Sequence, residues 1–195
     1  MDNRLRIIGG IWRGRKISFP DRQGLRPTSD RMRETLFNWL RLDMENSTCL
    51  DLFAGSGALG FEAASRGAAR VIMVDSDAEA IKSLNHHRHI LGADQIQVIQ
   101  ADCTHYLGRT EKMAFDLVFV DPPFNRNLVP AVCGLLESGW LKPHAKIYIE
   151  TELSAQPAPT LGWRVLKSER MGLSRCFLLE RVSDSSITPV SSTHH

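Results

Sequence analysis

A glycine-rich loop is the first segment whose residue types and spacing could do chemistry. Residues 50–60 read LDLFAGSGALG, which puts glycines in the spacing G-x-G-x-x-G between an expected strand and an expected helix. We expect Gly55 to permit the sharp turn out of the strand, Gly57 to let a ligand approach the backbone, and Gly60 to let the helix pack close to the sheet. Asp75 ends the next expected strand, 20 residues after Gly55, where its carboxylate can accept hydrogen bonds from both hydroxyls of a ribose. This pattern predicts a site for a nucleoside-containing cofactor.

Asp51, in the strand before the loop, separates two cofactors that fit this pattern, a nicotinamide dinucleotide and S-adenosylmethionine. A dinucleotide places its pyrophosphate at the helix N-terminus, where a neighbouring anion is unfavourable. The Asp51 carboxylate could instead hold the cationic amine of S-adenosylmethionine, directly or through water, and this favours the second cofactor. Asp102 follows the third expected strand, where it either caps the next helix or accepts a hydrogen bond from an adenine amino group. The residues predicted to line the cofactor are Asp51, Phe53, Ala54, Gly55, Gly57, Gly60, Asp75, Ser76, Asp102, Cys103 and Asp121.

The segment 115–124, FDLVFVDPPF, brings a second chemical group to the carboxyl edge of the expected sheet, where open α/β folds bind their ligands. Its two prolines lack backbone N–H groups and restrict the chain, so the carbonyl groups before them point in fixed directions. Asp121 and the Pro122 carbonyl can therefore act as two acceptors for one exocyclic NH2 group. Phe124 offers a flat apolar face on which a base can stack, typically worth ~1–3 kcal/mol. These three residues are the predicted catalytic residues.

Two acceptors on one amine would solve a chemical problem. The lone pair of an aromatic amine is delocalised into its ring, which makes the nitrogen a poor nucleophile. Two acceptors can favour a pyramidal nitrogen whose lone pair points at a sulfonium methyl group, so that the methyl passes in line to nitrogen. The released proton goes to solvent or transiently to Asp121, and positioning and charge complementarity supply the catalysis. The segment DPPF contains no cysteine, which argues against pyrimidine C5 methylation because that reaction needs a thiolate nucleophile.

The elements that must position these residues alternate between strand and helix from residue 48 onwards. Near-continuous apolar strands separated by helices predict a Rossmann-like α/β fold, with a parallel sheet covered on both faces. The last two strands are joined by a short connection around Gly172 and predict an antiparallel pair at the sheet edge. Strands are expected at 49–53, 70–74, 96–100, 115–120, 146–151, 163–170 and 174–182, and helices at 59–65, 77–91 and 128–137.

Two further elements precede the sheet. The runs 4–8 and 11–17 flank Gly9 and Gly10, a dipeptide suited to a tight turn, and predict a β-hairpin. Ser29 offers an N-cap side chain before a helix with one apolar face that should end near residue 42. We expect a basic hairpin arm over 1–27 that belongs to the same domain as a methyltransferase unit over 28–182, followed by a disordered tail over 183–195.

Composition limits the class of protein. The chain has 195 residues, 43% of them hydrophobic, and 24 Lys and Arg against 22 Asp and Glu. These values predict one globular domain and exclude disordered and collagen-like chains. No run reaches the roughly 18 apolar residues of a membrane helix, and the N-terminus lacks the apolar core of a signal peptide.

Neither the cysteines nor the histidines predict a metal site. The four cysteines are scattered without a CxxC pair, which predicts reduced thiols in a cytoplasmic protein. His86, His87 and His89 lie on one expected helix, with no carboxylate or cysteine at ligand spacing beside them. We therefore expect these histidines to be exposed and no metal to be bound.

Charge is unevenly distributed along the chain. Residues 1–41 contain ten basic and four acidic residues, a net charge of +6, and the remainder carries −4. A basic arm on a mildly acidic body predicts a polyanionic partner. A solvated basic surface explains the charge equally well.

These motifs together resemble class I S-adenosylmethionine-dependent methyltransferases, and more closely the RsmD family of bacterial small-subunit ribosomal RNA guanine-N2 methyltransferases. The resemblance covers nearly the whole chain and rests on IGGIWRGR at 8–15, LRPTSDRMRETLFNWL at 25–40, the loop at 50–60 and DPPF at 121–124. It implies a seven-stranded, mostly parallel sheet with one antiparallel strand, helices on both faces, and guanine N2 as the methyl acceptor. Asp75 stands where many relatives have Glu, a change that retains the carboxylate.

The same resemblance implies ribosomal RNA as the partner, within a partly or fully assembled small subunit, and a monomeric protein. Phosphate contacts fix orientation without reading sequence, so the shape of the substrate must select the guanine. The target base must be unstacked into the pocket. The predicted RNA-binding residues are Arg4, Arg6, Trp12, Arg13, Arg15, Lys16, Arg26 and Arg31.

Four other functions share parts of these features. Adenine-N6 methylation of DNA or RNA fits the same Asp-Pro-Pro-aromatic motif, and protein glutamine methylation fits a variant that begins with Asn. A non-catalytic RNA-binding or assembly factor could retain the pocket. A dehydrogenase could use the glycine loop.

Overall fold

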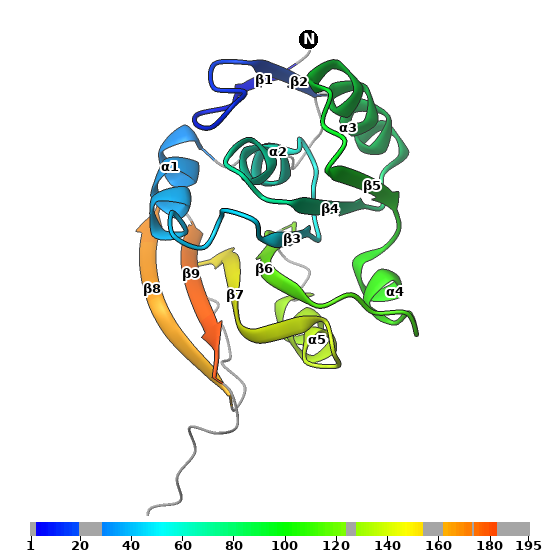
Figure 1. Ribbon diagram of the computed structural model, residues 1–195. Coiled ribbons are helices and arrows are strands. Elements are labelled where there is room, and N and C mark those ends of the chain that lie inside the picture. The colour runs from blue at the N-terminus through cyan, green and yellow to red at the C-terminus, as the bar shows by residue number, and fades with distance from the viewer. Residues whose placement is uncertain (1–2, 20–28, 124–127, 154–161, 173, 183–195) are drawn as a thin grey trace, which may run out of the picture.

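A seven-stranded sheet in the order β5-β4-β3-β6-β7-β9-β8 forms the centre of the computed structural model (Figure 1). The structure describes residues 3–19, 29–123, 128–153, 162–172 and 174–182. Two predicted site residues, Arg26 and Phe124, and the predicted tail at 183–195 therefore lie outside the described residues.

The sheet is parallel except for β9. That strand pairs antiparallel with β7 on one side and with β8 on the other, so it alone runs against the rest of the sheet. The predicted seven-stranded sheet with one antiparallel strand is confirmed. β7 starts earlier than expected, and its pairing with β6 shifts register near its start. The strands are β3 (Thr48–Asp51), β4 (Arg70–Asp75), β5 (Ile96–Gln100), β6 (Phe115–Val120), β7 (Leu141–Glu152), β8 (Trp163–Met171) and β9 (Ser174–Arg181).

Helices cover both faces of the sheet, as predicted, with α1, α2 and α3 above it and α4 and α5 below it in Figure 1. Side chains at the helix starts act as caps, because the first backbone N–H groups of a helix lack partners inside it. Ser29 accepts from the Met32 N–H of α1 at 3.2 Å, and Asp77 accepts from the Ala80 N–H of α3 at 2.8 Å. The helices are α1 (Asp30–Trp39), α2 (Ala58–Ser65), α3 (Ala78–Leu91), α4 (Cys103–Leu107) and α5 (Leu128–Leu136).

Apolar side chains fill the space on each side of the sheet. On the side of α1, the ring of Phe37 packs 6.0 Å from the ring of Phe119 in β6. On the side of α5, Trp140 is fully buried between Tyr106 and Phe115, as its apolar surroundings predicted. Within the described ranges, no helix is long and apolar enough to cross a membrane.

The N-terminal hairpin is present, but the tight turn predicted at residues 9–10 is wrong. β1 and β2 pair antiparallel over four residues each, and a wide loop joins them. The Ile7 N–H donates to the Arg15 carbonyl at 2.9 Å, which closes the base of this loop. The loop is wide because its tip docks on α2, where the Ile11 N–H donates to the Ser65 carbonyl at 2.8 Å. The two strands are β1 (Asn3–Arg6) and β2 (Lys16–Phe19).

His87 is buried, which corrects the expectation that all three histidines of α3 are exposed; His86 and His89 are exposed. The His87 Nε2 atom accepts a hydrogen bond from the Ser18 N–H of β2 at 3.1 Å. β2 lies against this side of α3, so His87 faces a packed neighbour instead of solvent. Burial lowers the pKa of His87, because desolvation disfavours the charged imidazolium.

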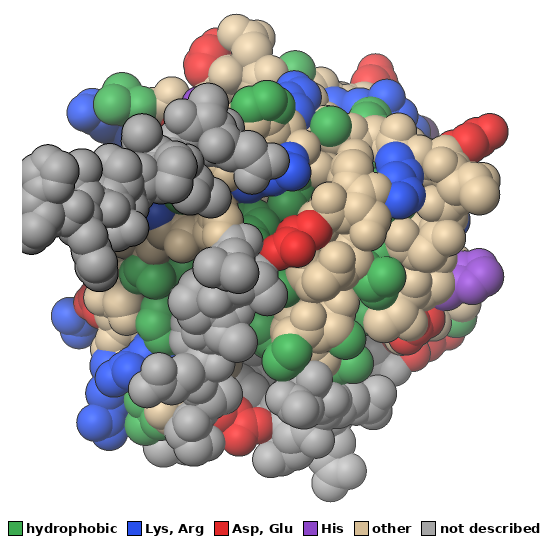
Figure 2. Space-filling model, turned by 90° about the horizontal axis from the view of Figure 1, so that it is seen from below, with side chains coloured by type: hydrophobic (Ala, Val, Ile, Leu, Met, Phe, Trp, Pro, Cys, Tyr) green, Lys and Arg blue, Asp and Glu red, His purple; other side chains and the backbone are tan. Residues whose placement is uncertain are grey.

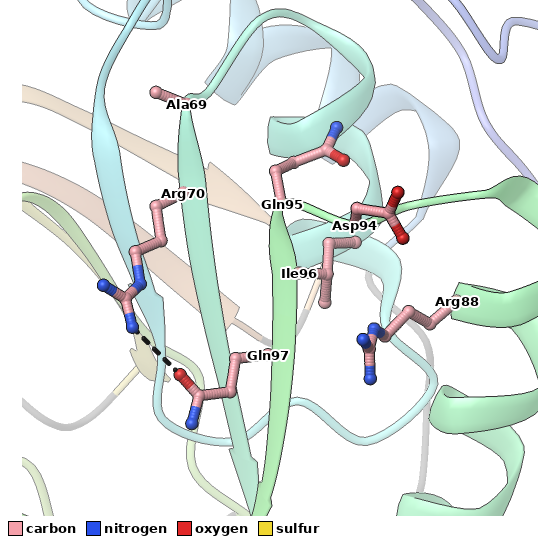
Figure 3. A pocket seen from close by; sticks show the side chains of 7 residues that line it. All are labelled: Ala69, Arg70, Arg88, Asp94, Gln95, Ile96 and Gln97. Carbon is pink, nitrogen blue, oxygen red and sulfur yellow. Dashed lines mark hydrogen bonds between the residues drawn. The ribbon is translucent and has the colours of Figure 1, made fainter.

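A shallow hollow of about 340 Å³ opens at the amino ends of β4 and β5 (Figure 3). Arg70, Arg88 and Asp94 contribute to its lining, and the Arg70 guanidinium donates to Gln97 Oε1 at 3.1 Å. The predicted cofactor residues follow the carboxyl ends of the strands instead. The hollow is therefore a separate feature at the opposite end of the sheet.

Candidate cofactor and nucleobase site

Four acidic residues that were predicted to belong to the site lie at the same edge of the sheet. Asp51 ends β3 and Asp75 ends β4, while Asp102 and Asp121 follow β5 and β6. These four strands are neighbours in the sheet and run parallel. Their carboxyl ends therefore share the edge at which open α/β sheets bind ligands.

The glycine loop is shaped by close packing at two of its glycines. Gly57 has φ +82°, and a Cβ there would lie 2.5 Å from the Phe61 ring and 2.7 Å from Leu84. The Cβ position of Gly57 therefore faces the protein interior, so packing against Phe61 and Leu84 requires a glycine here, and contact between its backbone and a ligand stays a prediction. A Cβ on Gly60 would lie 2.8 Å from the Met73 side chain of β4. Gly60 thus lets α2 sit close to the sheet, as predicted.

Asp51 is a buried carboxylate that caps α2. Its Oδ2 atom accepts from the Gly60 N–H at 3.1 Å, while Gly57 at the N-cap position has no side chain to do so. Burial raises the pKa of Asp51 to about 7, and backbone N–H groups of Gly60 and Phe53 oppose the shift. The carboxylate thus lies at the base of the glycine loop, where it would add negative charge to a bound amine's surroundings.

Asp75 ties the loop to the end of β4. Its Oδ2 atom accepts from the Gly55 N–H at 2.8 Å, and its Oδ1 atom accepts from the Asp77 N–H at 2.9 Å. These bonds fix the direction of the carboxylate, and each oxygen retains a lone pair for a further donor. Ser76, next in the chain, is exposed.

Asp102 caps α4, one of the two roles that the sequence left open. Its carboxylate accepts from the N–H groups of Thr104 at 2.9 Å and His105 at 3.2 Å. The pKa of Asp102 is lowered, chiefly by the hydrogen bond from the Thr104 hydroxyl. The side chain is exposed, whereas Cys103 beside it is buried, and burial raises the pKa of its thiol.

The DPPF segment begins directly after β6. Asp121 is half-buried, Pro122 is buried and Pro123 is exposed. Sequence reasoning missed Glu150 on the neighbouring strand β7, which is only 8% exposed. The available signal was a glutamate inside the largely apolar run KIYIETE. Charged side chains are seldom buried in a strand unless they have a partner or a function.

Apart from Arg26, which lies outside the described residues, the predicted RNA-binding residues lie on the hairpin and at the start of α1. The side chains of Arg4, Arg13 and Lys16 are exposed. Trp12 is half-buried and packs against the core, so only part of its side chain is accessible to a partner. The other exposed members of the group are Arg6, Arg15 and Arg31.

A buried ion-pair cluster that sequence reasoning missed fixes the hairpin to the body. Glu62 of α2 is fully buried and accepts from the backbone N–H groups of Ile8 and Gly9, both at 2.8 Å. It also pairs with Arg66 at 2.7 Å and faces Arg33 at 3.5 Å. Two cations and two N–H donors therefore surround one carboxylate, as a buried charge requires.

Metal-ligating side chains do not gather in the described part of the chain. Among those residues, no group of three or more His, Cys, Asp or Glu side chains could hold a metal ion. The four cysteines are buried as free thiols, and burial raises the pKa of Cys49 and Cys176 to about 12. Thiols in this state are poor ligands and poor nucleophiles.

The fold and the edge residues together define the class of protein. A mostly parallel seven-stranded sheet, a glycine loop after β3 and a carboxylate at the end of β4 match the class I S-adenosylmethionine-dependent methyltransferase fold. A solved 16S rRNA N2 G1207 methyltransferase from Thermus thermophilus, in complex with AdoMet and guanosine, superimposes with a TM-score of 0.70 at 22% identity, covering 94% of this chain and 50% of that one. At this identity the likeness concerns the fold alone.

Closer relatives show the family. The family model described as "Conserved hypothetical protein 95" matches residues 5–180. The "Ribosomal RNA small subunit methyltransferase D" of Haemophilus influenzae is 43% identical, over 87% of this chain and 90% of that protein. A solved putative methyltransferase, yhhF from Escherichia coli, is 40% identical with a TM-score of 0.85, covering 93% of this chain and 99% of that one. The chain belongs to the RsmD family of ribosomal RNA methyltransferases.

Proposed function

We propose that this protein methylates the exocyclic N2 of a guanine in small-subunit ribosomal RNA and uses S-adenosylmethionine as cofactor. The observation that carries the proposal is the position of Asp121 and Pro122 directly after β6, at the edge that also holds the glycine loop. An acceptor pair at this place suits an amine that must meet a cofactor bound over the neighbouring strands. The similarity to small-subunit ribosomal RNA methyltransferases supports ribosomal RNA as the substrate.

The hydrogen-bond acceptors at the sheet edge fit S-adenosylmethionine. The Asp75 carboxylate, held by the Gly55 N–H, would accept from ribose hydroxyls, and the exposed Asp102 carboxylate would accept from the adenine amino group. Asp51 would supply negative charge below the methionyl amine. When bound, the cofactor supplies a methyl group on a positively charged sulfur.

The chain's own residues would prepare the base. The Asp121 carboxylate and the Pro122 carbonyl would accept the two hydrogens of the guanine amine and hold its nitrogen lone pair toward the cofactor side. Asp121 would also receive the amine proton transiently before solvent takes it. Phe124, which lies outside the described residues, would stack on the base.

The wider arrangement follows from the same proposal. The basic arm over 1–27 would contact rRNA phosphates, and the unit over 28–182 would hold cofactor and base. We propose a monomer that acts in the cytoplasm on a partly or fully assembled small subunit. The hairpin loop is already docked on α2, and the basic side chains described above remain at the surface, where RNA can reach them.

The test uses small ribosomal subunits from cells that lack this protein. Subunits are incubated with protein and labelled S-adenosylmethionine, and their RNA is digested to nucleosides and separated. We expect label in N2-methylguanosine. Label in N6-methyladenosine would contradict the proposal and favour the adenine alternative.

A pair of variants tests catalysis. Asp121→Ala is expected to reduce methyl incorporation by about 10²-fold or more, because an acceptor for the amine and its proton is removed. Its affinity for S-adenosylhomocysteine should stay close to that of the wild type. Asp94→Ala, in the hollow at the other end of the sheet, is the control and should retain activity. Full incorporation by Asp121→Ala would contradict the catalytic role of Asp121, and no incorporation by the wild type would favour a non-catalytic RNA-binding factor.

A further inference from the structure

Glu150 lies beside the catalytic segment in a row that crosses three strands. Val120 of β6 pairs with Ile149 of β7. Asp121 is the residue directly after β6, and Glu150 is the residue after Ile149 within β7. Glu150 in turn pairs with Cys176 of β9. Neighbouring strands lie about 4.8 Å apart and laterally paired residues share a face. If the β6–β7 register continues by one residue, the two carboxylates lie next to each other on the same side of the sheet.

The surroundings agree with this placement. Tyr148 lies two residues before Glu150 on the same face, and its hydroxyl donates to Glu150 Oε2 at 3.3 Å. The pKa of Tyr148 is raised well above its usual value, first by burial and then by the charges of Glu150, Cys176 and Asp121. Both carboxylates thus lie close enough to act on the same buried hydroxyl.

Glu150 retains a free acceptor at this place. Its side chain is more than nine-tenths buried, and among the described residues its one hydrogen bond is the one from Tyr148. Within the described residues, the second oxygen of Glu150 accepts no hydrogen bond. An ionised carboxylate accepts hydrogen bonds and donates none. A ligand donor is therefore the group that this oxygen can bind.

The bases that carry an exocyclic amine differ in the ring atom beside it. Guanine has the N1–H donor next to its N2 amine, whereas adenine has the acceptor N1 and cytosine the acceptor N3 beside theirs. A second carboxylate next to the amine-binding one attracts an N–H and repels a ring lone pair. Asp121 and Glu150 side by side therefore match the Watson–Crick edge of guanine and oppose those of adenine and cytosine.

We propose that Glu150 is a specificity-determining residue, whose free oxygen accepts the N1–H of the target guanine while Asp121 and Pro122 hold its N2 amine. This inference rests on the proposed function and deepens it. Tyr148 is a positioning residue that holds the other oxygen of Glu150. Rejection of adenine follows from Glu150, since Asp121 and Pro122 would accept either amine.

The test compares guanosine with 2-aminopurine riboside, which has the same 2-amino group but an acceptor at N1. The fluorescence of 2-aminopurine riboside reports its binding in the presence of S-adenosylhomocysteine, and guanosine is measured by competition. The wild type should prefer guanosine. Glu150→Gln should weaken the binding of guanosine by about tenfold. It should leave the affinity for 2-aminopurine riboside unchanged or increase it, because the amide NH2 can donate to N1 of that nucleoside. The preference should therefore reverse.

Controls separate selection from damage to the pocket. Glu169→Gln makes the same change in the same row, two strands from Glu150, and should keep the wild-type preference. Tyr148→Phe should weaken the binding of guanosine by a smaller factor and leave the binding of 2-aminopurine riboside unchanged. This variant replaces Glu150→Gln as the test if Glu150→Gln fails to bind S-adenosylhomocysteine. If Glu150→Gln weakened the binding of both nucleosides equally, or changed the binding of neither, the inference would be overturned.

Labelling of small subunits distinguishes this inference from the proposed function. If the wild type forms no N2-methylguanosine, the proposed function fails and the role of Glu150 fails with it. If the wild type forms it and Glu150→Gln forms it at the same kcat/KM, the role of Glu150 alone is wrong. We expect Glu150→Gln to lower kcat/KM by about tenfold or more.

Discussion

Asp51 shows how one buried carboxylate can serve both the fold and the ligand. Its carboxylate caps α2 by accepting from the Gly60 N–H, and this hydrogen bond offsets part of the cost of burying the charge. A carboxylate with a pKa of about 7 is only partly ionised at neutral pH in the free protein. A cationic amine bound nearby would favour the ionised form and draw the proton off. If Asp51 lies near the cofactor amine, as proposed, cofactor binding should be coupled to loss of a proton from Asp51.

This coupling predicts a pH dependence of cofactor affinity. A carboxyl pKa raised to about 7 means that the carboxylate is present above that pH and lost below it. Affinity for S-adenosylhomocysteine, which carries the same amine, should therefore fall by about tenfold between pH 8 and pH 6. Isothermal titration calorimetry in two buffers of different ionisation enthalpy should also detect proton release near pH 6.

Asp51→Asn is the matched control for this prediction. The amide can still accept from the Gly60 N–H but never ionises, so affinity should be weak and nearly independent of pH between 6 and 8. A wild-type affinity that is flat over this range would contradict the coupling. A pH profile that survives in Asp51→Asn would assign the titration to another group.

At the scale of elements, periodicity predicted most of the fold. Runs such as 96–100 and 115–120 match β5 and β6 residue for residue. In β6 the reason is burial on both faces, which favours an almost continuous apolar run. Two of the errors share one cause, which is docking between elements far apart in sequence. His87 is buried by β2, and the loop after β1 is opened by α2. No local pattern contains such partners.

The positions of several candidate site residues in the fold could be predicted for the same reason, whereas their roles stay predictions. Asp75 and Asp121 stand at strand ends, where position along the chain predicts position at the sheet edge. Gly57 was assigned to the ligand but faces Phe61 and Leu84, because its direction depends on how α2 and α3 pack. Glu150 needed the strand order, which places β7 beside β6.

Glu62 is the residue on which docking of the hairpin loop depends. Glu62→Gln keeps the shape but turns one acceptor into a donor, which must face either a backbone N–H or a guanidinium. Breaking a buried charged cluster in this way should lower the free energy of unfolding by about 3–5 kcal/mol. Urea denaturation measures this, and amide exchange should show faster exchange at Ile8 and Gly9.

The control for this change is Glu79→Gln on α3, where the side chain is exposed. It removes the same charge and should change stability by less than about 0.5 kcal/mol. If Glu62→Gln left the exchange of Ile8 and Gly9 at the wild-type rate, the loop would be held by other bonds, such as those of Ser65.

At the scale of the whole molecule, the basic charge is less than the sequence count suggests. Arg33, counted in the basic arm, is fully buried, and its charge is balanced by Asp30 at 2.6 Å and by Glu62. The hairpin is at the top of Figure 1. Figure 2 shows the face seen from below, where basic and acidic side chains are interspersed between hydrophobic ones. A polyanion should therefore approach from the side of the hairpin.

Salt dependence of RNA binding tests that orientation. Replacing Arg13, Arg15 and Lys16 with Ala should weaken binding to the small subunit and reduce the slope of log K against log salt by up to about 0.9 for each phosphate that is no longer neutralised. Affinity for S-adenosylhomocysteine should not change, because the cofactor residues lie at the sheet edge. Arg70→Ala combined with Arg88→Ala, in the hollow of Figure 3, is the control and should leave the slope unchanged. An equal decrease in both variants would mean that net charge, rather than the hairpin, attracts the RNA.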